Sequence, residues 1–235
     1  MDEPSNEPEQ PGNRLPYGWT NGVWHVGDEA IKHYLGADSA ANFEASLLKA
    51  LHSTLPVPAV ISFSDRELRM EFVPGINGQP ALEGASESEA RSMFAMLGRL
   101  LARTHELGAA LDVDLPGEGE SLVHGDFSWP NTIFSEDRRE LRAVVDWEKA
   151  HLGDIVEDIA WFEWNVRKWW PPRLYGMSDF FDAYGTRPDW ATRHQAMLSC
   201  IDRHISRITP VAPHLVPKWQ GFREEVERYE PLDKD

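Results

Sequence analysis

The sequence predicts an α+β fold of two lobes: a small, mainly antiparallel β lobe with one helix, followed by a larger, mostly helical lobe. Short β-rich runs bounded by turn residues fill the part before residue 75, and helical periodicity dominates after residue 154. The 235 residues suffice for two small lobes, and 41% of them are hydrophobic, as in ordinary globular proteins. We expect a disordered acidic tail over residues 1–16, a first lobe over 17–75 and a second lobe over 76–235.

Two pairs of strands are expected in the first lobe. The stretch VWHVGDEAIKHYL, residues 23–35, predicts two strands joined at Gly27-Asp28, and Asn21-Gly22 upstream is typical of a hairpin turn. AVISF and ELRMEFV predict two more strands, on either side of a turn at residues 64–66. Because consecutive strands are joined by short turns, both pairs should be antiparallel.

A single helix should separate these strand pairs. Asp38-Ser39 is a suitable N-cap, and Phe43, Leu47 and Leu51 recur at helical spacing up to about His52. The two lobes should then leave a cleft, which is where small-molecule sites tend to lie.

The second lobe should begin with a long helix over residues 87–107. Ser86 and Glu89 form the S-x-x-E capping box at its start, and Gly108 suits its C-terminal cap. A strand ending at His124, a kinked loop and a hairpin over residues 131–146 follow, and the elements after residue 154 should be helical.

The charge of the chain limits its partners. Lys and Arg number 23 against 39 Asp and Glu, a formal net charge of −16, which should repel nucleic acid and anionic membranes. A small neutral or cationic partner is easier to accommodate. No apolar run approaches the roughly 20 residues of a membrane span and the N-terminus lacks a signal-peptide pattern, so we expect a cytoplasmic protein. Cys200 is the only cysteine, which excludes an internal disulfide and a cysteine-based zinc site.

The hairpin brings polar residues together. Its two strands run in opposite directions, so Asn131 at the start of the first and Asp146 at the end of the second should share one end. The short loop HGDFSWPN holds His124 and Asp126 near that end. Two carboxylates and an amide oxygen suit Mg²⁺, which prefers hard oxygen ligands and substrate phosphates. Alternatively, Asp126 and Asn131 only shape the loop through bonds to their own backbone.

The spacing favours the first interpretation. His-x-Asp followed by Asn five residues after the Asp reproduces the kinase catalytic-loop pattern H-R-D-x-x-x-x-N, with Gly125 in the Arg position. Together with VVDWEKAHLGDIVEDIA, AIKHY, FEASLLKAL before LPVP, and MEFVPG, this motif resembles the aminoglycoside phosphotransferase family. These are relatives of choline and fructosamine kinases with a protein-kinase-like fold, and the resemblance covers roughly residues 17–165.

The resemblance implies a role for each matching residue. It implies that Asp126 is the catalytic Asp that accepts or orients the proton of the substrate hydroxyl, and that Asn131 and Asp146 hold Mg²⁺. Lys32 would contact the nucleotide phosphates and Glu44 would pair with it. The remaining implied or supporting positions are the backbone of Glu71, Phe72 and Val73 for the base of ATP or GTP, His124 as the hydrogen-bonder that pins the loop, Asp154 as an N-cap, and Asp158 as a brace for the loop.

Some of these positions have simpler explanations. Lys32 could be a solvated lysine on an edge strand and Glu44 an exposed helix residue. The first lobe also lacks G-x-G-x-x-G, since YGWTNGV offers only Gly18 and Gly22. Coverage of the phosphates by backbone amides would then be either looser or supplied by Thr20 and Asn21. The preference for ATP or GTP stays open.

Two stretches bear on the acceptor. The segment WFEWNVRKWW contains four tryptophans that pack the core or form an aromatic wall for a ring or cation: Trp161, Trp164, Trp169 and Trp170. The run LDVDLPGEGE is an acidic patch for a polyamine or simply a solvated loop.

The function predicted is that of an ATP- or GTP-dependent O-phosphotransferase that acts on a hydroxyl of a small molecule, with an aminoglycoside or other antibiotic as the favoured acceptor. One alternative is a metabolic kinase for choline, a sugar or a nucleoside-like compound. The alternative from another class is a catalytically silent kinase-like protein that binds a ligand and gives immunity by sequestration.

Overall fold

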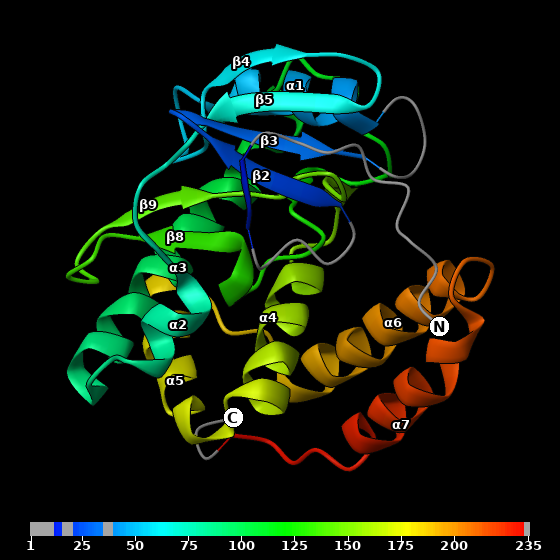
Figure 1. The fold of residues 1–235 in the computed structure, drawn as a ribbon. Coiled ribbons are helices and arrows are strands. Elements are labelled where there is room, and N and C mark those ends of the chain that lie inside the picture. Colours follow the sequence, from blue (N-terminus) through cyan, green and yellow to red (C-terminus); the bar gives the residue numbers. More distant parts are fainter. Residues whose placement is uncertain (1–11, 16–20, 35–39, 233–235) are drawn as a thin grey trace, which may run out of the picture. The chain divides into compact units, whose positions relative to one another are not determined.

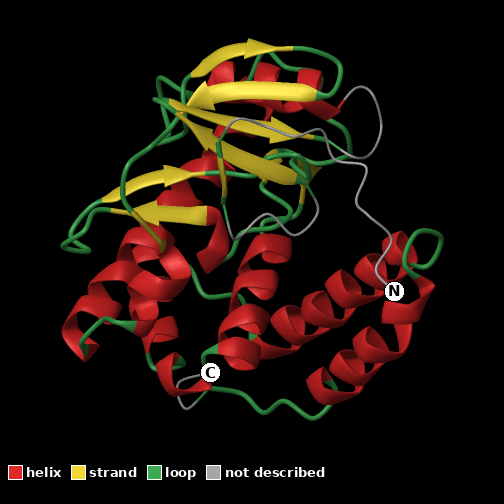
Figure 2. Ribbon diagram, in the orientation of Figure 1, coloured by secondary structure: helices red, strands yellow, loops and turns green. Residues whose placement is uncertain are grey.

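A computed structural model describes residues 12–15, 21–34 and 40–232. The chain divides into two compact units between Pro74 and Gly75. Strands make up most of the first unit, whereas helices dominate the second (Figures 1 and 2). This arrangement confirms the predicted α+β fold class, with a small antiparallel sheet and one helix before a larger helical part.

The first unit is built on a five-stranded antiparallel sheet. The order is β1-β2-β3-β5-β4, with β1 Asn13–Arg14, β2 Gly22–Val26, β3 Glu29–His33, β4 Val60–Phe63 and β5 Glu67–Glu71. Both predicted strand pairs are present: β2 pairs with β3 and β4 with β5. Gly27 turns the first pair with a φ of +63°, a left-handed conformation that glycine adopts without steric cost. Because β3 lies between β2 and β5, it is a central strand of this sheet.

The helix of the first unit, α1 (Ala40–Leu51), contacts β4 and β5. Ala41, Ala45 and Leu48 recur at helical spacing and are buried with Leu47 and Leu51, so the helix is held by its apolar face. The proposed N-cap, Asp38-Ser39, lies outside the described residues, as do Gly18 and Thr20.

The prediction of disorder over residues 1–16 was wrong for the last residues of that range. Asn13–Arg14 pairs with His25 and Trp24 of β2, and the Leu15 amide donates to Val23 O at 2.8 Å. Disorder was predicted because this segment has few apolar side chains to bury. Backbone hydrogen bonds to the edge of β2 do not need such side chains. Residues 1–11 and 16 lie outside the described ranges.

The second unit is organised around α3 (Glu87–Leu107). The predicted capping box is present, with the Glu89 amide donating to Ser86 Oγ and the Ser86 amide donating to Glu89. α3 packs along α5 (Gly176–Tyr184), and Gly98 allows the close approach, because a Cβ there would lie 2.2 Å from Phe180 O. A short helix, α2 (Gly78–Glu83), precedes α3.

Five short strands hold the loops of the second unit. β7 (Ser121–Val123) pairs with β10 (His151–Gly153), and β8 (Thr132–Phe134) lies between β6 (Ile76–Asn77) and β9 (Leu141–Val144). The β8–β9 hairpin is the predicted one. Strands β6 and β10 and helix α2 were not predicted, because elements of two to six residues carry too little periodicity to be recognised.

Three further helices complete this unit: α4 (Val156–Trp169), α6 (Trp190–Ile208) and α7 (Val216–Val226) (Figure 1). Their shared core contains Ala160, Trp164, Met197, Ile201 and Val226. In the described part of the chain, no helix combines the length and the apolar character that crossing a membrane would require.

Candidate active site

The loop after β7 presents Asp126. Phe127 and Trp129 on this loop are fully buried and pack on Phe162 and Phe94, at centroid distances of 5.5 and 4.9 Å. A 3₁₀ turn over Trp129–Asn131 then leads into β8, with Pro130 at its start. The buried aromatic side chains anchor the loop, and Asp126 stands at its partly exposed side.

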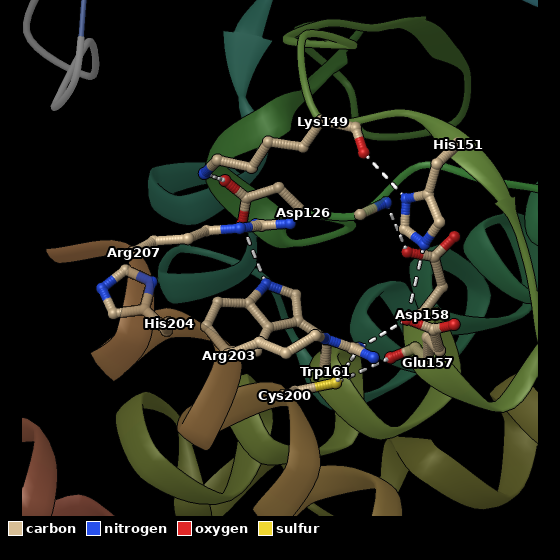
Figure 3. A pocket seen from close by; sticks show the side chains of 11 residues that line it. Asp126, Lys149, His151, Glu157, Asp158, Trp161, Cys200, Arg203, His204 and Arg207 are labelled. Carbon is tan, nitrogen blue, oxygen red and sulfur yellow. Dashed lines mark hydrogen bonds and ion pairs between the residues drawn. The ribbon is translucent and has the colours of Figure 1, made fainter. Parts of the chain in front are cut away.

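Two side chains from other elements fix the Asp126 carboxylate. Lys149 Nζ lies 2.6 Å from Oδ2, and the Trp161 indole N–H donates to Oδ1 at 2.9 Å (Figure 3). Burial alone would lower the pKa of the Lys149 ammonium, but the Asp126 carboxylate, together with the charges of Asp146 and Glu148, raises that pKa above its ordinary value. Each carboxylate oxygen therefore has one strong donor and keeps lone pairs for a further one. Lys149 was not among the predicted site residues, and Trp161 was considered only as a core residue or part of an aromatic wall, not as a hydrogen-bond donor to Asp126.

His124 connects this loop to the end of β9. The Asp126 amide donates to its Nδ1 at 3.2 Å, which requires the proton to be on Nε2, and Nε2 lies 3.2 Å from Val145 O. The ring is fully buried and packs against Trp147 at 4.5 Å. Neutral His124 thus bonds both to the Asp126 backbone and to the residue before Asp146.

Asp158, on α4, accepts bonds from the backbone of the same loop. Its two oxygens accept the His124 amide at 2.7 Å and the Gly125 amide at 2.9 Å, and His105 Nε2 lies 3.2 Å away. His105 in turn contacts the Tyr184 hydroxyl at 2.7 Å. Burial works to raise the pKa of Asp158, but the bonds from His105 and from the His124 amide outweigh it, so that pKa is lowered. Helices α3, α4 and α5 all contribute to this support.

Gly125 is required by the loop geometry. Its φ is +78°, and a Cβ at this position would lie 2.4 Å from Lys149 O. We expect Gly125→Ala to lower the free energy of unfolding by about 1–3 kcal/mol, measured by urea denaturation. Gly221→Ala on α7 is the matched control: a Cβ there meets nothing within 4 Å, so it should stabilise by up to about 1 kcal/mol. Equal effects of the two substitutions would contradict this account of Gly125.

Asn131 and Asp146 lie at the same end of the β8–β9 hairpin. Thr132 pairs with Val144, and the Val145 amide donates to Asn131 O at 3.0 Å. Asn131 Nδ2 donates to Asp126 O at 2.9 Å, so the side-chain carbonyl oxygen of Asn131 is the atom that could bind a metal ion. Asp146 has a φ of +69°, a left-handed conformation found among strained functional positions. One amide oxygen and one carboxylate are hard donors that fit Mg²⁺.

Lys32 and Glu44 form an ion pair inside the first unit. Lys32 Nζ lies 2.7 Å from Glu44 Oε2, both side chains are buried, and the Tyr34 hydroxyl donates to the same carboxylate. Since Lys32 is on the central strand β3, the alternative of a solvated edge lysine is wrong, and so is that of an exposed Glu44.

The backbone of residues 71–73 is partly committed to the sheet. The Glu71 amide donates to Ala59 O at 2.8 Å and the Phe72 amide to Asp28 O at 2.9 Å. The Phe72 ring also stacks on His25 at 3.6 Å. Of these three amides, only that of Val73 has no bond to another residue in the described ranges.

Asp154 makes the capping contacts predicted for it, one position before the residue that bounds α4. The helix begins at Val156 with Ile155 as its N-cap, and exposed Asp154 accepts the Val156 amide at 3.0 Å from one position earlier. The capping bond thus comes from the residue before Ile155. Sequence spacing does not resolve a difference of one residue at a helix end.

A small pocket adjoins Asp126 in the second unit. Gly125, Asp126, Lys149 and Asp158 line it. The other lining residues come from α4, α6 and β10 (Figure 3): Glu157, Trp161, Cys200, Arg203, His204, Arg207 and His151. Burial raises the pKa of the Cys200 thiol to about 11, so the thiol is protonated near neutral pH. The α6 side chains were not predicted.

The tryptophan-rich segment contributes both to the core and to the lining of this pocket. Trp164 and Trp170 are buried, Trp169 is 48% exposed, and Trp161 lines the pocket. The acidic run after α3 is exposed, and no member of it lines this pocket in the described part of the chain.

Comparison with known proteins decides the family. A sequence model of the phosphotransferase enzyme family matches residues 12–120 and 107–195 of the chain. The chain belongs to this family. The predicted resemblance is therefore confirmed: the chain is a member of a phosphotransferase enzyme family.

Solved structures of aminoglycoside phosphotransferases share the fold. A GDP and kanamycin complex of APH(2'')-IIIa has a TM-score of 0.73 at 13% identity, over 93% of each chain. The Streptomyces rimosus enzyme APH(3'')-Id, in complex with ADP and streptomycin, has a TM-score of 0.60 at 18% identity, over 79% of this chain and 90% of that one. At these identities, the likeness shows that this phosphotransferase has the same fold.

Curated relatives are much longer proteins. Mouse acyl-CoA dehydrogenase family member 10 is 26% identical over 50% of this chain and 16% of its own length. Chicken acyl-CoA dehydrogenase family member 11 is 31% identical over 45% of this chain and 14% of its own length. The phosphotransferase chain thus matches a minor part of these relatives.

Proposed function

We propose that this phosphotransferase moves the γ-phosphate of ATP or GTP to a hydroxyl of a small molecule, with Asp126 as the catalytic residue. The observation that carries the proposal is the Asp126 carboxylate at a pocket, fixed by Lys149 and Trp161 on a loop with the kinase spacing to Asn131. Nucleotide complexes of proteins with this fold support the choice of donor.

The chemistry asks mainly for placement and for neutralisation of charge. The bond from the γ-phosphorus to the oxygen bridging to the β-phosphate breaks, and a bond from the acceptor oxygen to the γ-phosphorus forms. The acceptor proton passes to Asp126, and a nucleoside diphosphate leaves. Asp126 orients the hydroxyl, while His124 and Asp158 keep the loop in place.

Each unit contains residues that we assign to donor binding. Lys32, oriented by Glu44, would contact the nucleotide phosphates, and the Val73 amide would bond to the base. Asn131 and Asp146 would hold Mg²⁺, which supplies positive charge against the phosphates when bound. Their oxygen donors and the unusual backbone of Asp146 support this assignment.

Two acceptor classes have support. Gentamicin, kanamycin and streptomycin complexes of proteins with this fold favour an aminoglycoside or other antibiotic, and hence a resistance enzyme. A metabolic hydroxyl compound is the second candidate, because the pocket at Asp126 is edged by arginines of α6. Enzyme-family membership supports either of these over a silent binding protein.

Nucleotide binding is tested by thermal unfolding. MgATP or MgGTP at 100 times its Kd should stabilise the wild type by about 2.7 kcal/mol through mass action. Lys32→Met should lose most of this gain, because the phosphates lose their cationic partner. Since Lys32→Met also removes the cationic partner of Glu44, the shift is measured within each variant. Lys49→Met, on the exposed side of α1, is the control and should respond like the wild type. A full shift in Lys32→Met would refute the role of Lys32.

A further inference from the structure

We infer that the acceptor carries an anionic group, a carboxylate or a phosphate, which Arg207 binds while the acceptor hydroxyl meets Asp126. This inference rests on the proposed function and specifies its substrate class. It departs from the cationic acceptor that the net charge of the chain would allow. The charged side chains that line the pocket beside Asp126 favour an anionic ligand.

Every acidic group that lines this pocket already has cationic or donor partners. Asp126 is bound by Lys149 and Trp161. Glu157 contacts Arg203 at 2.5 Å and His151 at 3.4 Å, and buried Asp158 accepts backbone amides and faces His105. A polyamine or aminoglycoside would have to displace one of these partners to gain a salt bridge of its own.

The cationic side chains that line the pocket have fewer partners than the acidic ones. Arg203, His204 and Arg207 are at i, i+1 and i+4 on α6, and all three line the pocket (Figure 3). Arg203 is committed to Glu157 and also contacts Cys200 Sγ at 3.2 Å. Arg207 makes no hydrogen bond or ion pair with any residue in the described ranges. Among the charged side chains that line the pocket, Arg207 is therefore the one that is available to a ligand, and its charge is positive.

The environment of His204 also indicates that positive charge prevails on this side of the pocket. Burial, and after it the positive charges of Lys149 and Arg207, lower the pKa of His204 to about 4, although the Asp126 carboxylate acts to raise it. The neutral ring packs at a tilt against Trp219, with a centroid distance of 3.7 Å, and is stacked with Trp161 at 6.3 Å. Beside Arg207, the pocket thus has an aromatic wall that suits the carbon skeleton of a small organic acceptor.

An arginine suits the anionic end of such an acceptor. Its planar guanidinium binds a carboxylate or a phosphate through two parallel hydrogen bonds, and this fixes the orientation of the ligand as well as its position. A hydroxyl on the same molecule would then be presented to Asp126. Arg207 would be a specificity-determining residue, since it need not touch the transferred phosphate.

The test measures binding without nucleotide, at constant ionic strength, by thermal unfolding with five probes: 3-hydroxybutyrate, glycerol 3-phosphate, glycerol, choline and kanamycin. The wild type should be stabilised by an anionic probe, and which of the two anions acts better distinguishes carboxylate from phosphate. Arg207→Ala should weaken this binding about tenfold or more. Arg207→Glu should abolish it and favour choline or kanamycin. Arg99→Ala, which removes an exposed arginine of α3 outside the pocket, should bind the anions like the wild type.

Three results would overturn the inference: stabilisation by kanamycin or choline that is equal in the wild type and Arg207→Ala, no stabilisation by either anion, or anion binding that Arg207→Ala leaves unchanged. These outcomes are separate from failure of the proposed function, which would show as the absence of any MgATP or MgGTP shift and of phosphate transfer. A protein that binds nucleotide and transfers phosphate but prefers cations keeps the proposed function and loses only the anionic acceptor.

Discussion

Asp126→Asn is expected to lower the kcat/KM of phosphate transfer by about 10²–10⁴-fold, the usual contribution of a positioned acid–base group. The amide has nearly the same size as the carboxylate and can still accept the Trp161 N–H, so the loop should stay folded. It cannot accept the acceptor proton, and it no longer pairs with the charge of Lys149. Transfer is measured with whichever acceptor the wild type phosphorylates.

The matched control is Asp112→Asn, which removes an exposed carboxylate that does not line the pocket. Its kcat/KM should equal that of the wild type. Nucleotide-dependent stabilisation should persist in both variants, which separates loss of chemistry from loss of binding. Transfer by Asp126→Asn at the wild-type rate would contradict the catalytic assignment.

Asp158→Asn is expected to lower the free energy of unfolding by about 3–5 kcal/mol, as the removal of one partner from a buried charged network does. The carboxylate accepts two backbone amides of the loop and faces His105, whereas an asparagine would turn an N–H₂ group toward at least one of these donors. Asp179→Asn is the control: that carboxylate is 30% exposed and pairs with Arg91, so the change should cost about 1 kcal/mol or less.

The effect of Asp158 should depend on pH. The pKa of Asp158 is lowered in the folded protein, so its carboxylate stabilises the fold above its unfolded pKa of about 3.9, and this contribution is lost as pH falls through the folded value. The difference between wild type and Asp158→Asn, measured by urea denaturation, should therefore be full at pH 7 and shrink in acid. A difference that grows as pH falls would contradict this account of the loop.

The sequence allowed the hairpin end of the site to be predicted for a topological reason. Antiparallel strands place the start of one beside the end of the next, so Asn131 and Asp146 had to be neighbours whatever the rest of the chain did. Residues such as Lys32 and Glu44 depended on family resemblance, because a lysine on a strand and a glutamate on a helix carry no signal of their pairing.

The rest of the site depends on how helices pack. Trp161 follows Asp126 by 35 residues, and its contact with that carboxylate is set by the placement of α4. Arg203 and Arg207 share a face of α6, but helical spacing does not tell which element that face meets. A pairing such as Lys149 with Asp126 also arises from a turn after β9 that has no periodic pattern.

The central claim is that this chain transfers a nucleotide phosphate to a small-molecule hydroxyl through Asp126. The most direct measurement incubates the wild type and Asp126→Asn with Mg²⁺, γ-labelled ATP or GTP, and a mixture of anionic, neutral and cationic hydroxyl compounds, and then follows the label into phosphate esters. The account predicts a labelled ester with the wild type and at most a trace with Asp126→Asn. No labelled ester with either nucleotide, or equal labelling by the two proteins, would contradict it.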